Sequence, residues 1–475
     1  LTGKKVSAKF VPFELLQEAI LGVRAISSEV VLTDDDLEEL ELRAPVDIPV
    51  QVEVPPMNVP EPRIPESVLV KPKTAKKSFD GSNVVGAVDD ILSQAVDTGV
   101  SDLHFEVFKD YANIRFRKNG TLIPVPEFQK FVTDNYIAVV ARVKILANLD
   151  IAERRLPQDG KISFKSKGGT QVDFRVSVLP TNLGERIVIR ILNSSSLAVS
   201  VDGLGFSDQQ KQDFITAIEA PQGMVLVTGP TGSGKSTTLY GAINYLNKPD
   251  VNILTAEDPV EYTLSGISQV QIREDIGLTF ASALRSFLRQ DPEIILVGEI
   301  RDTETADIAT KASLTGHLVL STLHTNSAVG AITRLINMGL PTYLVSSALT
   351  LVVAQRLIRV NCKQCLVDDS VNLSQLDKIA EATSTRISSL KKGKGCPHCA
   401  NTGYSGRKAI HEVLRVTPAI QDAINRDANE NEIEAIAVQE GYKTMLSSAV
   451  RYLVSGDLSV EEFFRVVPHE TESAS

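Results

Sequence analysis

The segment GPTGSGKS, residues 229–236, constrains the fold more than any other part of this sequence. It fits the phosphate-binding template G-x-x-x-x-G-K-[ST], in which glycines permit a tight loop whose backbone amides point at phosphate oxygens. The apolar run MVLVT precedes the loop, and STTLYGAINYLN follows it with helical spacing. This succession predicts a buried parallel strand, a loop and a helix whose N-terminus holds a nucleotide phosphate.

Within this loop, side chains and backbone are expected to share the binding of a nucleotide. Lys235 supplies a positive charge to the β and γ phosphates, and Ser236 offers a hydroxyl to Mg²⁺. A glycine-rich turn that fits the template by chance is the alternative, and the flanking strand and helix count against it. The expected nucleotide contacts are Gly229, Pro230, Thr231, Gly232, Ser233, Gly234, Lys235, Ser236 and Thr237.

Further apolar strands carry polar residues at their ends. Glu299 follows IILVG, where an ordinary Walker B strand would end in Asp, and Glu257 and Asp258 follow another apolar run. A carboxylate in such a place can polarise water or hold Mg²⁺ through water. LTGHLVLSTLHTN carries His317 and His324 on either side of a strand. A lone histidine after a strand is usually structural. Two histidines that flank a strand among Thr, Gly and Asn residues leave two roles equally open, a structural one and the sensing of the γ phosphate.

The four cysteines of the chain all fall in two CxxC pairs. The pairs are Cys362 with Cys365 and Cys396 with Cys399, and thirty residues separate them. This spacing predicts a tetrahedral four-thiolate zinc site. Paired disulfides are the alternative in a secreted chain, but the opening residues do not read as a signal peptide. A redox role needs one pair rather than two, and His398 is not expected to be a ligand.

Composition narrows the class of protein. The 475 residues suggest two to four domains, and 43% hydrophobic with 23% charged residues is ordinary for globular ones. A net charge of −10 argues weakly against nonspecific nucleic-acid binding. No stretch reaches the roughly 18 uninterrupted apolar residues of a membrane span. The proline-rich residues 44–82 read as an extended linker, whose basic run Lys71–Lys77 is more simply solvated than bound to a membrane.

These motifs together resemble the secretion ATPases. VTGPTGSGKSTTLY, LTAEDPVEY, FLRQDPEIILVGEIRDTETA, TGHLVLSTLHTN and the CxxC pair before GYSGR are similar to the assembly ATPases of type II secretion systems and type IV pili. The resemblance runs from about residue 83 to 467. It implies an α/β fold with a P-loop RecA-like ATPase core, a preceding PAS-like α/β domain, a small four-cysteine zinc lobe and a C-terminal helical region.

The resemblance also implies a division into six parts. The opening LTGKKV is similar to the end of an N-terminal domain, which suggests a truncated chain, and VVLTDDDLEELEL has a helix capping box. The zinc lobe is too small to bury a core of its own, so metal binding would contribute its folding free energy. The parts are the N-terminal remnant 1–43, the linker 44–82, an α/β domain 83–196, the ATPase core 205–361, the zinc lobe 362–406, and a helical region with a polar tail 407–475.

Site residues follow from the same resemblance. Glu257 and Asp258 match the family's Asp box, Glu299 its Walker B carboxylate, and His317 and His324 its His box. Which of Glu257 and Glu299 activates water stays open.

Four arginines complete the expected site. Arg175 and Arg190 match arginines that the family needs from the preceding domain, and Arg285 and Arg289 lie four apart, where they would share a helical face. Surface ion pairing is the alternative for each arginine alone. Whether they act within or across subunits stays open.

The implied function is ATP hydrolysis by a homo-hexamer that drives assembly of a pilus or pseudopilus. The implied cofactors are ATP, Mg²⁺ and Zn²⁺. The implied location is cytoplasmic and peripheral on the inner membrane, with an inner-membrane platform protein and cytoplasm-facing assembly components as partners. Acidic phospholipid is a further candidate contact, and no nucleic acid is expected. Extracting a pilin helix of ~20 apolar residues costs ~10 kcal/mol, which calls for a cycling energy source.

Two other functions compete with this one. A DNA-uptake or conjugation-type motor is the first, and the cysteine pairs and the acidic net charge count against it. A non-hydrolysing nucleotide switch is the second, and Glu257 and Glu299 count against it. Within the family, AIHEVL after GYSGR slightly favours secretion over pilus assembly.

Overall fold

The structure is a computed structural model that describes residues 83–192, 200–369 and 390–467. The predicted N-terminal remnant, its capping box and the linker 44–82 lie outside these residues. The described residues all belong to the larger of two compact units, residues 72–475. Among the described helices, none is long and apolar enough to cross a membrane.

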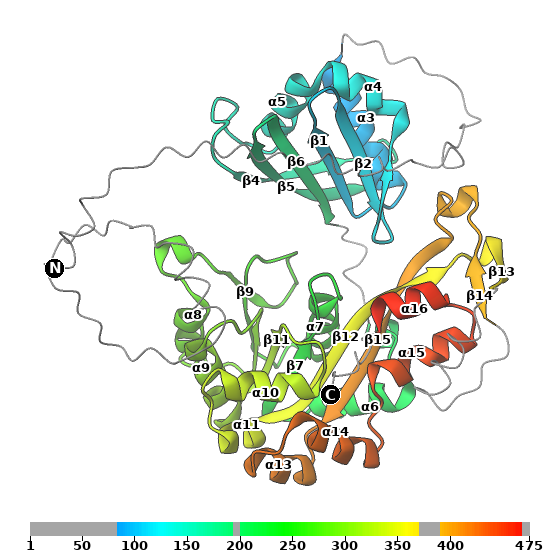
Figure 1. Ribbon diagram of the computed structural model, residues 1–475. Helices are drawn as coiled ribbons and strands as arrows, with labels where there is room; N and C mark the ends of the chain where they lie inside the picture. Colours follow the sequence, from blue (N-terminus) through cyan, green and yellow to red (C-terminus); the bar gives the residue numbers. More distant parts are fainter. Residues whose placement is uncertain (1–82, 193–199, 370–389, 468–475) are drawn as a thin grey trace, which may run out of the picture. The chain divides into compact units, whose positions relative to one another are not determined.

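Six strands of the first described segment form an antiparallel sheet in the order β3-β2-β1-β6-β5-β4 (Figure 1). Buried and exposed residues alternate along β5, so one face is apolar and the other polar. Three helices contribute to the single apolar core on the first face. The elements are α3 (Val84–Asp97), β1 (Asp102–Val107), β2 (Ala112–Lys118), β3 (Thr121–Pro124), α4 (Pro126–Asp134), α5 (Tyr136–Leu146), β4 (Gln158–Lys165), β5 (Gln171–Thr181) and β6 (Gly184–Leu192).

A second sheet has seven strands, in the order β15-β12-β7-β11-β10-β8-β9. All its neighbouring strands are parallel except β12 and β15. The predicted strands MVLVTG and IILVG are β7 and β10, and β11 lies between them. The strands are β7 (Gly223–Thr228), β8 (Ile253–Glu257), β9 (Ser268–Gln271), β10 (Ile294–Val297), β11 (Leu318–Leu323), β12 (Leu349–Asn361) and β15 (Tyr404–Arg415).

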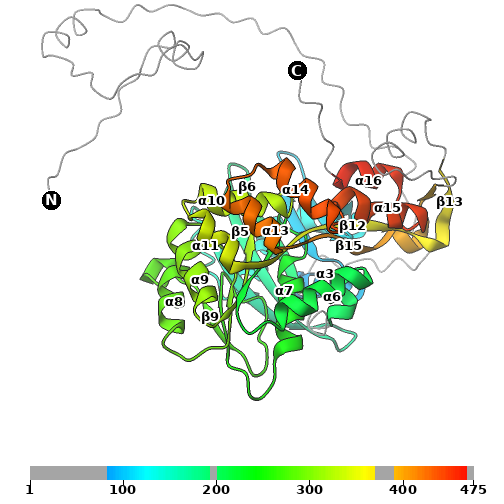
Figure 2. The ribbon, with the colours of Figure 1, turned by 90° about the horizontal axis from the view of Figure 1, so that it is seen from below.

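Two apolar cores cover the two faces of this sheet. Val225 and Val227 of β7 pack into one core with the helices α6 and α7, while Leu226 packs into the other with α8, α9 and α10. Figure 2 shows α6 and α7 on the opposite side of β12 and β15 from α10 and α11. These helices are α6 (Asp208–Ile218), α7 (Lys235–Leu246), α8 (Phe280–Phe287), α9 (Thr303–Leu314), α10 (Val329–Asn337) and α11 (Thr342–Ala348).

The region after residue 406 differs in part from the expected helices. It first completes β15, which pairs antiparallel with β12 along most of its length. Residues 409–414 are buried, because core side chains cover both faces of the strand, and this tertiary environment favours β structure. Helices follow as expected: α13 (Pro418–Asn425), α14 (Glu430–Gln439), α15 (Met445–Val454) and α16 (Val460–Val466).

Candidate nucleotide site and four-cysteine cluster

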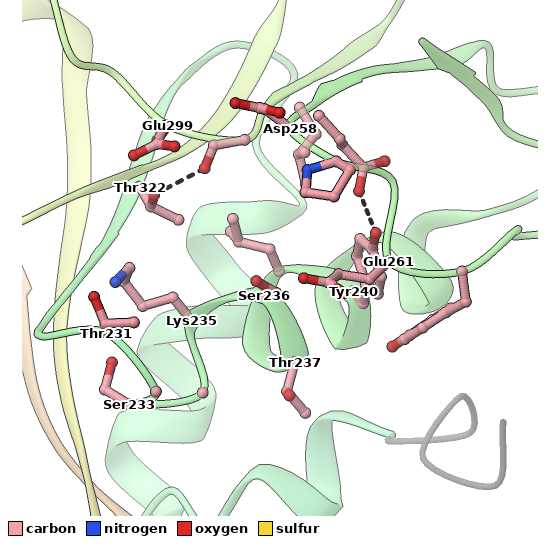
Figure 3. Close-up of a pocket in the computed structure, with 18 of the residues that line it drawn as sticks. Thr231, Ser233, Lys235, Ser236, Thr237, Tyr240, Asp258, Glu261, Glu299 and Thr322 are labelled. Atoms are coloured by element: carbon pink, nitrogen blue, oxygen red, sulfur yellow. Dashed lines mark hydrogen bonds between the residues drawn. The ribbon is translucent and has the colours of Figure 1, made fainter. Parts of the chain in front are cut away.

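The P-loop lies at the carboxyl edge of the parallel strands. β7 ends at Thr228, the loop follows, and α7 begins at Lys235. Because β8, β10 and β11 run parallel to β7, the residues after their ends meet at the same edge, where ligands of open α/β sheets bind. A pocket of about 430 Å³ opens there, and P-loop residues line it together with Glu257 and Glu299 (Figure 3).

Buried Gln355 of β12 fixes the shape of the P-loop. Its Nε2 donates to the carbonyl oxygen of Ser233 over 2.9 Å, and its Oε1 accepts from the Thr238 hydroxyl over 2.6 Å. A Cβ atom at Gly229 would lie 2.3 Å from the Gln355 carbonyl oxygen, and at Gly234 the φ of +92° favours glycine. Sequence reasoning missed Gln355, because no motif marks a strand that follows the loop by more than a hundred residues.

Lys235 extends back over the loop that precedes it. Its Nζ donates to the carbonyl oxygens of Gly229 (2.9 Å) and Pro230 (3.3 Å), and Figure 3 shows its side chain beside Thr231. Burial lowers the pKa of Lys235, while the charge of Glu299 opposes that shift. Ser236 is exposed in the first turn of α7, where a hydroxyl suits Mg²⁺.

Glu299 stands at the end of β10 among charged neighbours. One carboxylate oxygen lies 2.5 Å from an Arg301 Nη atom, and the other lies 3.3 Å from His324 Nε2. A second Nη atom of Arg301 lies 3.9 Å from Asp258, so this arginine links the two acidic motifs. The Thr322 hydroxyl donates to the carbonyl oxygen of the residue before Glu299 (Figure 3). Arg301 belongs to the motif FLRQDPEIILVGEIRDTETA, but its link to Asp258 depends on the fold and is not predictable from the motif.

Glu257 is instead enclosed by hydrogen-bond donors. It is buried and accepts from the hydroxyls of Tyr240 and Thr255 and from Gln269 Nε2, the last two over 2.5 and 3.0 Å. Burial raises the pKa of Tyr240 most, and the hydrogen bond that its hydroxyl donates to Glu257 raises it further. The two catalytic candidates therefore differ: Glu299 pairs with Arg301 and contacts His324 at the pocket, and Glu257 is packed into the pocket wall.

The structure separates the two histidines of the expected His box. His324 follows the carboxyl end of β11 and lines the pocket. His317 precedes the amino end of the same six-residue strand, where its carbonyl oxygen accepts from Gly223 and its Nδ1 lies 3.0 Å from the Ala312 carbonyl oxygen. A strand of this length spans about 20 Å, so only His324 is brought to the P-loop edge.

Two of the predicted arginines come from the antiparallel sheet. Arg190 of β6 lines the pocket, and its Nε lies 3.0 Å from an oxygen of Asp102. Arg175 of β5 donates to the Val260 carbonyl oxygen over 2.7 Å and lies 3.2 Å from Glu261.

The other two arginines do not share a helical face. Arg285 lies on α8 and forms an ion pair with Glu304. α8 ends at Phe287, and Arg289 lies beyond its end, where one Nη donates to the Arg285 carbonyl oxygen over 2.7 Å. Neither arginine is among the residues that line the pocket.

The four cysteines meet in one cluster. Their sulfur atoms lie within 4.8 Å of one another, and the structure contains no disulfide among them. The sulfurs of Cys362 and Cys396, and those of Cys365 and Cys399, are 3.9 Å apart. A tetrahedral zinc site with Zn–S bonds of about 2.3 Å has edges of about 3.8 Å.

The surroundings of the cysteine cluster also fit a metal. The backbone amides of Cys396 and Gly403 donate to the Cys399 sulfur, as expected for a thiolate ligand. The His398 Nε2 lies 3.5 Å from the Ser405 hydroxyl, and this histidine is not part of the cluster. The cluster joins two short 3₁₀ helices and two short strands. These are the 3₁₀ helices η5 (Lys363–Cys365) and η6 (Pro397–Cys399) and the strands β13 (Leu366–Asp368) and β14 (Lys391–Gly393).

This fold and this pocket define a P-loop ATPase. The family model described as "Type II/IV secretion system protein" matches residues 77–465, and the chain belongs to that family. The resemblance inferred from the motifs and the α/β fold class are thus confirmed, and the chain is an ATP hydrolase of the type II secretion and type IV pilus assembly group.

Curated relatives come from both systems. The chain is 46% identical to the putative type II secretion system protein E of Escherichia coli K12, over 82% of this chain and 78% of that protein. It is 45% identical to the type IV pilus assembly ATPase PilB of Pseudomonas aeruginosa, over 82% of this chain and 69% of that protein. The two identities are nearly equal, so the chain is similar to proteins of both systems.

Solved structures share the fold. The pilus retraction motor PilT with bound ADP superposes with a TM-score of 0.56 at 25% identity, covering 81% of this chain and 98% of that one. The ATPase DotB of Legionella pneumophila gives 0.57 at 22% identity, covering 84% of this chain and 98% of that one.

Proposed function

We propose that this chain hydrolyses ATP as a homo-hexamer and that its cycle drives assembly of a pilus or pseudopilus at the inner membrane. The convergence of the P-loop with Glu299 at one sheet edge carries this proposal, because it provides both phosphate binding and an activating carboxylate. The relatives in both machines support the assembly role.

In the proposed reaction, Lys235 leaves the loop carbonyls and neutralises the β and γ phosphates. Ser236 would hold Mg²⁺, and the metal would neutralise the negative charge that develops on the phosphates during the reaction. Glu299 would orient and deprotonate the attacking water, because its carboxylate lies in the pocket and is held by side chains that can exchange partners. His324, which contacts Glu299, would respond to loss of the γ phosphate.

Glu257 and Asp258 would support this chemistry from β8. Glu257 is already occupied by three donors, which suits a residue that shapes the site and sets its charge. Asp258 is more accessible and lies near Arg301, so it would help to hold the metal's water shell or the arginine.

Arg175 and Arg190 would bring positive charge to the γ phosphate from the preceding domain. An arginine finger of this kind can contribute about 10³ to 10⁵ in rate. Nucleotide turnover would then be felt as movement of that domain, the kind of transition that can perform work in a ring.

The four cysteines would bind one zinc ion with structural function. Four thiolates close the coordination sphere, so the site leaves no position for catalysis. The metal would hold together the short elements around it, and the partner contacts of this lobe in the secretion or pilus machine would depend on it.

We place the ring in the cytoplasm, against an inner-membrane platform protein and the cytoplasm-facing parts of the machine. Acidic phospholipid is a further proposed contact, and nucleic acid is not. The relatives' roles in secretion and pilus assembly support this location. Stimulation of turnover by vesicles of acidic phospholipid, with none by DNA, is the expected result; the reverse would favour the DNA-motor alternative.

Replacing Lys235 by Ala tests the proposal. ATP turnover should fall below a tenth of the wild-type rate, because the loop loses the positive charge that neutralises the phosphates. The melting temperature without nucleotide should barely change. In the organism that makes this protein, a gene encoding the variant should also fail to complement deletion of the wild-type gene. Loss of exported protein would assign the chain to secretion, and loss of surface pili would assign it to pilus assembly. A variant that retains turnover would refute the P-loop assignment.

A further inference from the structure

β1 carries two carboxylates on the polar face of the antiparallel sheet. Leu103 and Phe105 point into the apolar core, so Asp102 and Glu106 point to the opposite face. Both are buried, at 6% and 3% exposure. A buried carboxylate needs charged or hydrogen-bonding partners, and arginines of the neighbouring strands supply them.

Asp102 is held on one side and pairs with Arg190 on the other. Its Oδ2 accepts from the Ser101 hydroxyl over 2.8 Å and lies 3.6 Å from Arg117 Nε. Its Oδ1 accepts from Arg190 Nε over 3.0 Å. The register places Arg190 directly opposite Asp102 on the neighbouring strand, so both side chains start from adjacent points of the same face.

The contact engages the part of the arginine nearest the sheet. Nε lies before the two terminal nitrogens, so fixing it leaves those nitrogens at the outer end of a side chain that is 62% exposed. Asp102 itself is only 9% exposed in its side chain. An arginine held in this way loses little further rotamer freedom when it binds a phosphate, where an unheld one gives up as much as about 2 kcal/mol.

We propose that Asp102 is the positioning residue for Arg190, which it orients so that both terminal guanidinium nitrogens face the nucleotide phosphates. This inference rests on the proposed role of Arg190 at the γ phosphate. Asp102 does not touch the nucleotide; it acts by keeping the guanidinium in the one orientation that allows a two-point contact with phosphate oxygens. Its loss would slow the chemical step more than it weakens nucleotide binding.

Glu106 offers a matched control on the same strand and face. It pairs with Arg115 over 2.7 Å and with Arg186 over 2.8 Å, and it is at least as buried as Asp102. Neither of its arginines is among the residues that line the nucleotide pocket. Replacing Glu106 thus removes a similar buried charge without touching Arg190.

The test compares Asp102→Asn, Asp102→Ala and Glu106→Gln in the full-length protein. Turnover of the Ala variant should fall roughly tenfold, the size of a typical coupling between contacting residues, while KM for ATP stays within about twofold. Asp102→Asn should fall less, because its amide oxygen can still accept from Nε. Glu106→Gln should keep wild-type turnover. Equal loss in the Asp102→Asn and Glu106→Gln variants would overturn the proposal, since it would reflect the charge of the whole face.

Combining Asp102→Ala with Arg190→Ala separates positioning from folding. If Asp102 acts through Arg190, the double variant should turn over no more slowly than Arg190→Ala alone; additive losses would mean that Asp102 acts elsewhere. Should Arg190→Ala itself keep full turnover, the proposed role of Arg190 fails. Should it lose turnover while Asp102→Ala does not, only the positioning role fails.

If the Asp102 variants do not fold, Arg190→Lys decides instead. Lysine has a single charged nitrogen, which can meet either the carboxylate or a phosphate. The turnover of the Arg190→Lys variant should therefore be as low as that of Arg190→Ala. A turnover rate near that of the wild type would overturn the proposal.

Discussion

His324 Nε2 lies 3.3 Å from a carboxylate oxygen of Glu299, at the edge of the sheet where the P-loop lies. The histidine and Arg301 are both more than half exposed, whereas the Glu299 side chain is 15% exposed. Glu299 can thus exchange partners without leaving buried groups unpaired. Glu257, enclosed by three donors, cannot, and this difference makes the two carboxylates distinguishable by mutation.

Glu299→Gln should bind ATP with nearly unchanged affinity and hydrolyse it 10² to 10⁴ times more slowly, the usual contribution of a general base. The amide keeps the size of the side chain and loses its charge and basicity. Single-turnover measurements and a nucleotide-binding titration check this. Loss of Mg²⁺-dependent binding, with a normal rate for the nucleotide that does bind, would contradict a role in activating water.

Glu257→Ala should destabilise the protein, because Tyr240, Thr255 and Gln269 would lose a buried acceptor, at about 1–3 kcal/mol for each donor left unpaired. Glu299→Ala should leave the melting temperature nearly unchanged. Thermal unfolding without nucleotide compares the two. Equal melting temperatures would show that Glu257 has no structural share in the site.

Two tyrosines of α7 provide the control for that comparison. Tyr240 donates to Glu257 in the interior, and Tyr245 donates to Glu219 over 2.6 Å at the surface. Tyr240→Phe should therefore lower the melting temperature more than Tyr245→Phe does.

Zinc binding is expected at one ion per chain. Cys396→Ser should release the metal and loosen the short elements around it, while P-loop nucleotide binding persists, because the cluster lies in a separate part of the chain. His398→Ala is the matched control: it lies between two predicted ligands and outside the cluster, so zinc should stay. Metal analysis and limited proteolysis measure both effects. A metal-free protein whose cysteines are paired as disulfides would disprove the site.

Features that depend on neighbouring residues were predictable from the sequence. The P-loop sits between β7 and α7 because glycines, an apolar run and a helical pattern are adjacent in the chain. The cysteine cluster was predictable because two CxxC pairs at this separation are typical of a site in which four thiolates bind one metal ion. The six-part domain division and the catalytic roles of the site residues stay predictions.

Features that depend on strand pairing were not predictable. β15 forms because β12 and core side chains surround it, which its own residues do not indicate. His317 and His324 flank one strand in sequence, but a strand carries its two ends to opposite edges of the sheet. Gln355 and Asp102 matter through partners far along the chain, Ser233 and Arg190, and no local pattern pairs them.

The last prediction concerns which subunit supplies Arg190. Arg190→Ala should lower turnover far more than ATP affinity, and activity should depend on protein concentration if a ring is needed. Mixing Arg190→Ala subunits with Lys235→Ala subunits tests the direction of the contact. In a closed ring with heterologous interfaces, about a quarter of the sites in an equal mixture would regain both groups if the arginine acts across subunits.

A within-chain arginine predicts the opposite result. Every subunit in the mixture would then lack one of the two groups, and turnover would stay at the level of the separate variants. Mixing Lys235→Ala with Glu299→Gln is the matched control, because both residues belong to the same sheet edge of one chain and no mixture can restore a complete site. Recovery in that control would mean that subunits share more than the arginine, whereas recovery only in the first mixture would assign Arg190 to the neighbouring subunit's nucleotide.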